Sequence, residues 1–331
     1  MASKILFFLN SNSQTGLGHF SRCLNIARHL KATRSELEII FQGDLNDFSQ
    51  RSLKEFGFKY RLTSNPFEGE LEIKVDNINI FDSYLLDQTF IDYVCQKSNQ
   101  NFFIDDFALF DFSKAAGVIN FTIAPQYEEP KSAKKMLLGP KFFPYKPEIK
   151  KVREKVRKHK IENILVFISN SKIDEQLVQK SLNVISKSVE DLKTNLLLVS
   201  NDNDLNIYAN KLGFDVKPPV SNIEDYYDWA DLIISGGGLV KYESSYCLLP
   251  IVSFSLNEGQ ANDSKLLSQN GLIKYLGPFE DLNSPSSFNE MCSNLNSFIK
   301  DDEQRQTQKK RQETTFHSDS GGLLAKELIC E

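Results

Sequence analysis

A histidine in a glycine-containing loop is the first feature of this chain that could do chemistry. His19 follows Gly16 and Gly18, after the short apolar run Lys4–Leu9, which is typical of a strand in a parallel sheet. Apolar residues then recur at helical spacing over residues 20–30. His19 is therefore expected in the first turn of a helix, where free N–H groups can receive an anion and the positive potential favours a neutral imidazole. A neutral imidazole in that place could act as a general base.

A second glycine loop lies in the other half of the chain. Three consecutive glycines follow the apolar run Leu232–Ile234 and precede a helix expected from residue 239 or 240 to about residue 248. Such a turn lets the backbone approach a bulky anion, and the helix that follows supplies N–H donors. Glu243, about one turn inside that helix, could accept hydrogen bonds from the vicinal hydroxyls of a ribose. Together the two loops favour nucleotide binding over two simple turns. The loop residues expected to contact the ligand are Ser235, Gly236, Gly237, Gly238 and Leu239.

Composition narrows the class of protein. The 331 residues suffice for two domains, and a hydrophobic fraction of 40% with a charged fraction of 25% is ordinary for a globular protein. A net charge of -5 argues against nucleic acid as the main partner. The 5 cysteines and 4 histidines lack metal-ligand spacing, so no metal is expected, and the cysteine usage suits a reducing cytoplasm. Because no signal-peptide or membrane-spanning pattern is present, we expect a cytoplasmic protein without membrane insertion.

Apolar strand patterns alternate with helical patterns along both halves of the chain, which predicts βαβ units and parallel sheets. A Gly/Pro/Phe-rich segment, residues 139–147, and a charged stretch to Lys160 break this rhythm. We therefore predict an α/β protein with a domain at 1–150 and a second at 151–331, which includes a closing C-terminal helix. Strands are expected at Lys4–Leu9, Leu37–Phe41, Phe58–Leu62, Ile78–Phe81, Phe102–Ile104, Val118–Phe121, Ile164–Ile168, Leu196–Val199, Leu232–Ile234 and Ile251–Phe254. The polar tract Asp301–Thr315 is expected to form an exposed helix.

In their order and spacing these residues resemble a known family. It is the UDP-2,4-diacetamido-2,4,6-trideoxy-β-L-altropyranose hydrolases of pseudaminic acid biosynthesis, whose relatives include spore-coat polysaccharide proteins. The resemblance covers nearly the whole length, and its specificity lies in the set rather than in any one motif. The landmarks are Gly16–Leu24, Asp82–Tyr84, Ile104–Asp106, Leu137–Phe142, Ser221–Ile223, Ala230–Gly238, Glu243, Asn257–Gln260 and Asp319–Gly322.

The resemblance implies a GT-B-like architecture of two Rossmann-like domains with a cleft between them, the nucleotide being held mainly by the C-terminal domain. It implies a hydrolase that uses no metal or cofactor, inverts the anomeric carbon and releases UDP from a UDP-linked amino or deoxy sugar. His19 matches the catalytic base, Glu243 would hold the ribose, and Tyr84 would line the sugar side. Further matches to substrate-binding positions are Gly16, Gly18, Arg22, Lys146, Asn170, Asn257 and Gln260.

Several positions depart from the family pattern. Ser169–Lys172 replaces a Gly-Gly-Ser-Asp-like turn, and Leu239 and Val240 stand where many relatives have Ser-Thr. Lys146 replaces an arginine and so loses the bidentate fork, and two residues separate the usual Asn-Gln pair, Asn257 and Gln260. These changes cluster on phosphate and sugar contacts, so the resemblance leaves the nucleotide-sugar class intact without specifying the sugar.

Two other functions fit the same residues. A GT-B glycosyltransferase could use the same base on an acceptor hydroxyl instead of water, and an exposed apolar patch in the N-terminal domain would favour it. Phe142–Tyr145 is the only sequence candidate for such a patch, and inter-domain packing explains it as well. A non-catalytic nucleotide-sugar binding protein would not need an imidazole at residue 19.

Some polar and thiol groups have simpler explanations than chemistry. Asp82 could orient His19 through a hydrogen bond, whereas the pair Asp105 and Asp106 reads as a structural strand end. Cys23 and Cys247 lie on predicted buried faces, where packing is expected rather than nucleophilic catalysis.

Overall fold

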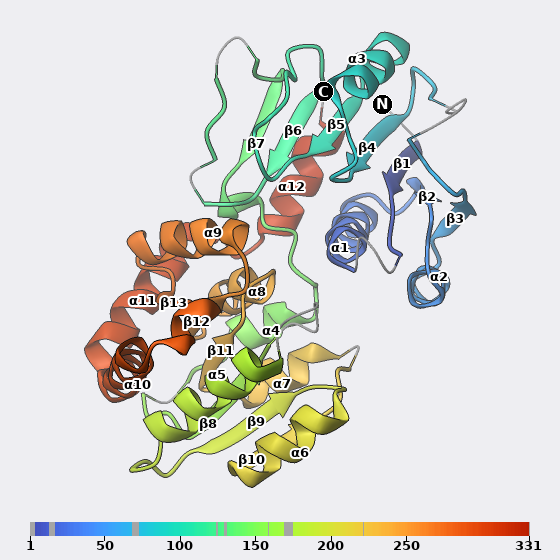
Figure 1. The fold of residues 1–331 in the computed structure, drawn as a ribbon. Coiled ribbons are helices and arrows are strands. Elements are labelled where there is room, and N and C mark those ends of the chain that lie inside the picture. The colour runs from blue at the N-terminus through green and yellow to red at the C-terminus, as the bar shows by residue number, and fades with distance from the viewer. Residues whose placement is uncertain are drawn as a thin grey trace. The chain divides into compact units, whose positions relative to one another are not determined.

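The computed structural model of the chain divides into two compact units (Figure 1). Unit 1 comprises residues 1–147 and 319–331, and unit 2 comprises residues 148–318. Residues 4–12, 17–67, 73–123, 125–128, 131–157, 159–168, 175–220 and 222–330 are described here. The expected division at residue 150 falls close to the change of unit. The C-terminal helix, which the expected division placed in the second domain, packs instead in unit 1.

Unit 1 is built on one parallel sheet in the order β3-β2-β1-β4-β5-β6-β7. The first six strands have the order of a Rossmann fold, and β7 extends the sheet by one. The strands are β1 Lys4–Leu9, β2 Glu38–Gly43, β3 Lys59–Leu62, β4 Ile78–Asp82, β5 Asn101–Ile104, β6 Gly117–Asn120 and β7 Lys135–Leu138. The helices are α1 Gly18–Thr33, α2 Asp47–Glu55, α3 Gln88–Lys97, α12 Ser320–Ile329 and the 3-10 turn Pro140–Phe142.

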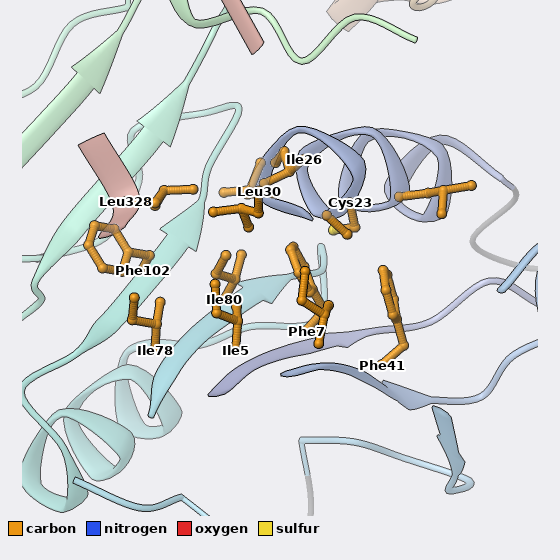
Figure 2. Close-up of a cluster of buried hydrophobic side chains, with 14 of the residues drawn as sticks. Ile5, Phe7, Cys23, Ile26, Leu30, Phe41, Ile78, Ile80, Phe102 and Leu328 are labelled. Carbon is orange, nitrogen blue, oxygen red and sulfur yellow. The ribbon is translucent and has the colours of Figure 1, made fainter. Parts of the chain in front are cut away.

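The alternating side chains of β1 divide the core of unit 1 between the two faces of its sheet. Ile5 and Phe7 pack with α1 and with Leu328 of α12 on one face, as Figure 2 shows. Leu6 and Phe8 pack with α3 on the other face. A strand covered on both faces has no polar side, which is why β1 appears in the sequence as a continuous apolar run.

Unit 2 has the six-stranded order β10-β9-β8-β11-β12-β13, also parallel and also that of a Rossmann fold. Its strands are β8 Asn163–Phe167, β9 Asn195–Val199, β10 Phe214–Lys217, β11 Leu232–Ser235, β12 Ile251–Ser255 and β13 Lys274–Pro278. Its helices are α4 Ile149–Arg153, α5 Glu175–Ser188, α6 Asn203–Lys211, α7 Ile223–Trp229, α8 Val240–Tyr246, α9 Glu258–Gln269, α10 Pro285–Lys300, α11 Asp302–Thr315 and the 3-10 turn Phe279–Asn283.

All ten predicted strands are present, and the strands that sequence patterns missed are all at sheet edges. β7, β10 and β13 each pair on one side only; β7 and β13 are largely half-buried, and exposed residues alternate with more buried ones along β10. An edge strand lacks the continuous apolar run of a central parallel strand, so its signal in the sequence is weak.

The expectation of an exposed helix at Asp301–Thr315 is wrong for one of its faces. Gln308 and Gln312 of α11 are buried, and their amides bond to backbone groups of Ile251, Leu249 and Leu272. The two amides satisfy backbone groups near the start of β12 that would otherwise be buried without partners. A hydrophobicity pattern assigns such polar residues to the solvent side, so the sequence suggested an exposed helix.

The strand order of each sheet changes direction at one point along the sheet. In unit 1 this point falls between β1 and β4, and in unit 2 between β8 and β11. Open parallel sheets bind ligands at the carboxyl ends of the strands at this point. The loop before His19 follows β1, and the three glycines follow β11. The fold therefore places the start of α1 and the three glycines at the binding edges of their own sheets.

No helix in the described parts of the chain combines the length and the apolar character needed to cross a membrane.

The closing helix α12 is held against unit 1 by close packing at Gly321. Ser320 Oγ donates to the Phe143 carbonyl at 2.7 Å, and His29 Nε2 bonds to the Tyr145 carbonyl at 2.8 Å. A Cβ added at Gly321 would overlap the His29 ring, so no side chain fits at this position without moving that ring. Phe143 and Tyr145 are buried in this contact, which accounts for the aromatic segment as packing within unit 1.

We expect Gly321→Ala to destabilise unit 1 by about 1–3 kcal/mol, because overpacking forces the His29 ring out of place. The matched control is Gly18→Ala, where an added Cβ meets nothing within 4 Å. Urea unfolding of both variants measures the difference. An unchanged unfolding midpoint for Gly321→Ala would show that α12 does not depend on this contact.

Candidate functional site

His19 occupies the second position of α1, directly beyond the carboxyl end of β1. The helix begins after Leu17 with no side-chain cap, and Gly18 is its first residue. The His19 side chain is only 4% exposed, which is unusual for a residue next to a loop. Its environment is polar, and therefore its partners determine its chemistry.

The Nδ1 atom of His19 lies 2.6 Å from Oδ1 of Asp82, the last residue of β4. Asp82 is fully buried and ionised, so it can only accept a hydrogen bond. Nδ1 must then carry the proton, and in a neutral ring Nε2 keeps its lone pair. Arg22 Nη2 lies 3.1 Å from Nδ1, but two donors cannot bond to each other. This short contact arises because both nitrogens donate to Oδ1 of Asp82. His19 is thus oriented with Nε2 as the proton acceptor.

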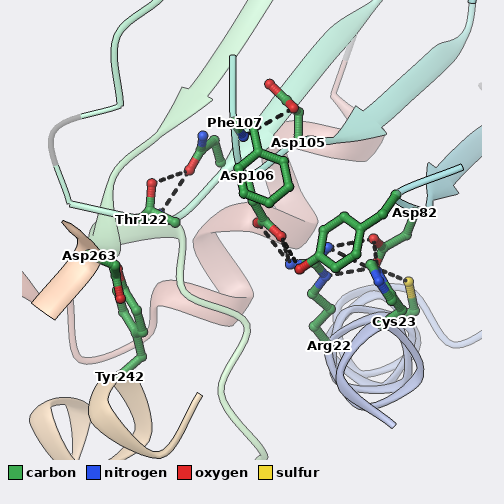
Figure 3. A network of polar contacts seen from close by, with 12 residues as sticks. Arg22, Cys23, Asp82, Asp105, Asp106, Phe107, Thr122, Tyr242 and Asp263 are labelled. Carbon is green, nitrogen blue, oxygen red and sulfur yellow. Dashed lines mark hydrogen bonds and ion pairs between the residues drawn. The ribbon is translucent and has the colours of Figure 1, made fainter. Parts of the chain in front are cut away.

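Arg22, one turn further along α1, joins two carboxylates (Figure 3). Its Nε and Nη2 donate to Asp82 at 2.7 and 2.6 Å, and its Nη1 donates to both oxygens of Asp106 at 2.9 Å. Burial would raise the pKa of Asp82, but the charges and hydrogen bonds of Arg22 and His19 outweigh it and hold that pKa well below its usual range. Burial would likewise lower the pKa of Arg22, and the two carboxylates raise it well above its usual value.

Cys23 is also part of this cluster and is not a nucleophile. Its thiol donates to Asp82 Oδ2 at 3.3 Å, and burial together with the Asp82 charge raises its pKa well above the usual value. A thiol that stays protonated is inert, as expected for a packed cysteine.

Tyr84 stands beside the imidazole, as the resemblance implies. The two rings meet edge to face with centroids 4.4 Å apart, and the phenol hydroxyl donates to Asp106 Oδ2 at 3.0 Å. Desolvation and the Asp106 carboxylate raise the pKa of Tyr84 well above its usual value, so the hydroxyl remains a donor. The ring itself stays 63% exposed and is available to a ligand.

The Asp105–Asp106 pair divides into two roles. Asp105 accepts the backbone N–H groups of Phe107 and Ala108 and the hydroxyl of Tyr127, so it shapes its own loop, as expected for a strand end. Asp106 instead binds Arg22 and Tyr84 and belongs to the histidine cluster. No local pattern in the sequence distinguishes the roles of these two neighbours.

In unit 2 the amides available to a ligand differ from those expected. The N–H groups of Gly236 and Gly237 are engaged by the Phe167 carbonyl and by Ser235 Oγ. Within the described residues, the N–H groups of Gly238, Leu239 and Val240 have no hydrogen-bond partner. Positive φ angles of 109° and 72° at Gly237 and Gly238 produce this turn and favour glycine at both positions. The donors are therefore shifted toward the start of α8.

Gln260 and Asn257 brace the glycine loop and cap α9. Asn257 Oδ1 accepts the Gln260 N–H at 3.0 Å as the N-cap of α9, and Gln260 Oε1 accepts the Leu256 N–H at 3.0 Å. A Cβ on Gly237 would come within 2.6 Å of Gln260 Oε1. The side chain of Gln260 thus touches the turn, which brings these two predicted residues to one place in unit 2.

Glu243 is half-buried on α8 and accepts the hydroxyl of Tyr227 at Oε2, at 2.6 Å. Burial and the Glu243 charge raise the pKa of Tyr227 well above its usual value, so this bond persists. One carboxylate oxygen has therefore a structural partner that the sequence pattern did not reveal.

Three other predicted substrate-binding residues are Lys146, Gly16 and Asn170. Lys146 lies half-buried in unit 1 between the 3-10 turn and the end of the unit. Gly16 and Asn170 lie outside the described residues. Among the described residues, no group of three or more His, Cys, Asp and Glu side chains could hold a metal ion.

Comparison with known proteins gives one relative by sequence. No protein-family model matches the chain. An uncharacterized protein of Methanocaldococcus jannaschii is 23% identical over 285 residues, which cover 78% of this chain and 56% of that protein. The chain thus spans little more than half the length of the curated relative it matches.

Solved structures share the whole fold at low identity. A Staphylococcus aureus MnaA structure with UDP has a TM-score of 0.67 at 11% identity, covering 99% of this chain and 98% of that one. Arabidopsis thaliana UGT89C1 with quercetin has a TM-score of 0.66 at 10% identity, covering 99% and 100%. Phytolacca americana UGT2 with UDP-2-fluoro-glucose and pterostilbene has a TM-score of 0.61 at 10% identity, covering 100% and 96%. The predicted GT-B-like architecture of two parallel-sheet domains is confirmed.

We expect Asp82→Asn to destabilise unit 1 by about 3 kcal/mol at neutral pH, because the buried Arg22 guanidinium loses one of the two carboxylates that balance its charge. The lowered pKa of Asp82 contributes stability above the unfolded pKa, about 3.9, and that contribution is lost as pH falls toward the folded value. The variant should therefore lose less stability than the wild type between pH 4 and pH 2.

The control is Asp92→Asn, which removes a surface ion pair with Lys114 and should cost less than about 1 kcal/mol. Unfolding curves at several pH values measure both variants. Parallel pH dependence in wild type and Asp82→Asn would contradict the assigned charge of Asp82.

Proposed function

We propose that this protein transfers a sugar from a uridine diphosphate sugar to a hydroxyl group, with His19 Nε2 as the base. The carrying observation is the short bond from His19 Nδ1 to Asp82, which leaves Nε2 as the proton acceptor at the ligand-binding edge of the sheet. The GT-B-like fold supports the proposal, because the neighbours that share it include proteins solved with UDP, with UDP-2-fluoro-glucose and pterostilbene, and with quercetin.

The charged groups around His19 can balance the charge that forms on a base. Asp82 and Asp106 carry two negative charges, and Arg22 carries one positive charge. With a neutral imidazole the four groups sum to -1, and with an imidazolium they sum to zero. Asp82 and Asp106 can therefore offset the positive charge that His19 gains when it takes a proton during the reaction.

The reaction we propose is a single displacement. The acceptor oxygen forms a bond to the anomeric carbon while its proton moves to His19 Nε2. The bond from the anomeric carbon to the phosphate oxygen breaks, and UDP leaves with the electron pair. Attack from the face opposite the leaving group inverts the anomeric carbon. Asp82 holds the imidazolium that results.

Unit 2 would hold the nucleotide. The N–H groups of Gly238, Leu239 and Val240, which have no partner among the described residues, can bind diphosphate oxygens and stabilise the charge that grows on UDP. The Glu243 carboxylate, which accepts the Tyr227 hydroxyl, would also accept the ribose hydroxyls. Arg22 is assigned to positioning rather than to substrate binding, because its donors serve Asp82 and Asp106.

Hydrolysis of a nucleotide sugar is the second candidate, with water in place of the acceptor. One observation favours it. The two residues that the hydrolase resemblance places around the sugar, His19 and Tyr84, are in ring contact at 4.4 Å. The two functions separate in one assay, because a hydrolase releases UDP and free sugar in water alone, whereas a transferase needs the acceptor for full turnover.

We expect His19→Asn to lower the turnover number about 10²–10⁴-fold, the usual contribution of a positioned proton acceptor. The affinity for UDP should stay close to that of the wild type. UDP release from a panel of UDP-sugars, with and without alcohols, measures turnover, and calorimetric titration measures affinity. His159→Asn, a change at an exposed histidine, serves as the control. Near-normal turnover of His19→Asn would remove this residue from the mechanism.

We expect Glu243→Ala to weaken UDP binding by about 1.5–3 kcal/mol, because a charged hydrogen-bond acceptor is lost. Tyr227→Phe is the matched control, since it removes the structural bond to Glu243 and leaves the carboxylate in place. Titration of UDP and of uridine into both variants separates the roles. If both variants bound UDP as tightly as the wild type and only Glu243→Ala melted earlier, the ribose assignment would fail.

A further inference from the structure

Two loops beside His19 expose a set of apolar side chains. One loop joins β4 to α3 and carries Tyr84 and Leu85, which are 63% and 64% exposed. The other follows β5 and carries Phe107 and Leu109, which are 57% and 73% exposed. We refer to these four residues as the apolar ledge. Exposed apolar groups that gather at a candidate site are typical of ligand contacts rather than of ordinary surface.

The two loops of the apolar ledge are joined to each other. The rings of Tyr84 and Phe107 have centroids 5.3 Å apart, and the Tyr84 hydroxyl binds Asp106. Gln88 and Asp111 exchange two hydrogen bonds, from Gln88 Nε2 to the Asp111 carbonyl at 2.9 Å and from the Asp111 N–H to Gln88 Oε1 at 2.8 Å. The ledge is therefore one continuous structure.

The loop that carries Phe107 is held in a costly conformation. Ala108 has a φ angle of 56°, in the left-handed region that residues with a Cβ rarely adopt. Asp105 holds it there by accepting the N–H groups of Phe107 and Ala108, and Tyr127 in turn donates to Asp105 at 2.7 Å. Strain of this kind persists at sites where geometry serves function. The exposure of Phe107 is thus imposed by its loop and does not result from a loose chain end.

The polar side chains next to the apolar ledge already have partners within unit 1. Asp106 accepts from Arg22 and Tyr84, Asp105 accepts from its own loop, and the Gln88 amide is taken up by Asp111. A site for a polar glycan offers hydrogen-bonding groups beside its aromatic rings, whereas this ledge presents rings and aliphatic chains. The chemistry of the ledge therefore matches an apolar face.

We propose that the apolar ledge binds the acceptor, and that the acceptor carries its reacting hydroxyl on an apolar ring. This inference rests on the proposed transfer function and adds the class of the second substrate. Tyr84 connects the ledge to the base, since its ring touches the His19 imidazole at 4.4 Å between centroids. A ring that stacks on Tyr84 and Phe107 would place its hydroxyl next to the His19 ring. An exposed apolar patch in the N-terminal unit is also the feature that favours a transferase over a hydrolase.

The test measures binding of a probe without any nucleotide sugar, so that it does not depend on turnover. The probe is 4-methylumbelliferone, a hydroxyl on fused apolar rings, and the polar counterpart is methyl β-D-glucopyranoside. Saturation-transfer NMR and titration should show that the protein binds 4-methylumbelliferone and not the glucoside. Phe107→Ser should weaken this binding about tenfold, through the loss of one aromatic contact. Leu109→Ser is a second variant on the same loop and should weaken it as well.

Two controls show where a failure lies. Leu62→Ser removes an equally exposed apolar side chain, 59% exposed on β3, and should bind the probe as the wild type does. His19→Asn should also keep probe binding, because the ledge and not the base binds the probe. If the wild type bound the probe but released UDP from no donor, the ledge would stand and the proposed transfer would fail. Equal probe binding by wild type, Phe107→Ser and Leu109→Ser would overturn the ledge, as would binding of the glucoside alone.

Discussion

One buried guanidinium holds the candidate active site of unit 1 together. Arg22 bonds to Asp82 at the end of β4 and to Asp106 beyond β5, so it ties α1 to two neighbouring strands. Asp82 then orients His19, and Asp106 fixes the hydroxyl of Tyr84. The base, its charge balance and the aromatic ring beside it therefore all depend on a single side chain that touches no ligand in this account.

Both units place their candidate functional groups at the same point of a parallel sheet, but the groups differ in kind. Each sheet has a point where its strand order reverses, and the residues that could take part in the reaction lie next to that point. Unit 1 places a titratable side chain there. Unit 2 places backbone donors there, made available by the positive φ angles of Gly237 and Gly238 and braced by Gln260. This division suits a reaction that needs one proton acceptor and one anion-binding turn.

The sequence predicted what depends on local pattern and missed what depends on distant partners. Central strands such as β1 were predictable because burial on both faces requires continuous apolar residues, whereas the edge strands β7, β10 and β13 have no such requirement. His19 and the glycine turn could be found by their local context. The link from Arg22 to Asp106 spans 84 residues and depends on which strands are neighbours, which no local spacing reveals. The bond between Tyr227 and Glu243 is of the same kind.

The protonation site of the His19 ring tests the central claim most directly. In nitrogen NMR spectra of the imidazole groups, with His19 assigned from the His19→Asn variant, the neutral ring of His19 should carry its proton on Nδ1 and not on Nε2. His29 provides an internal reference of the opposite form, because its Nε2 donates to the Tyr145 carbonyl. A His19 signal with the proton on Nε2 would contradict the account, since that ring could not accept a proton from the acceptor hydroxyl.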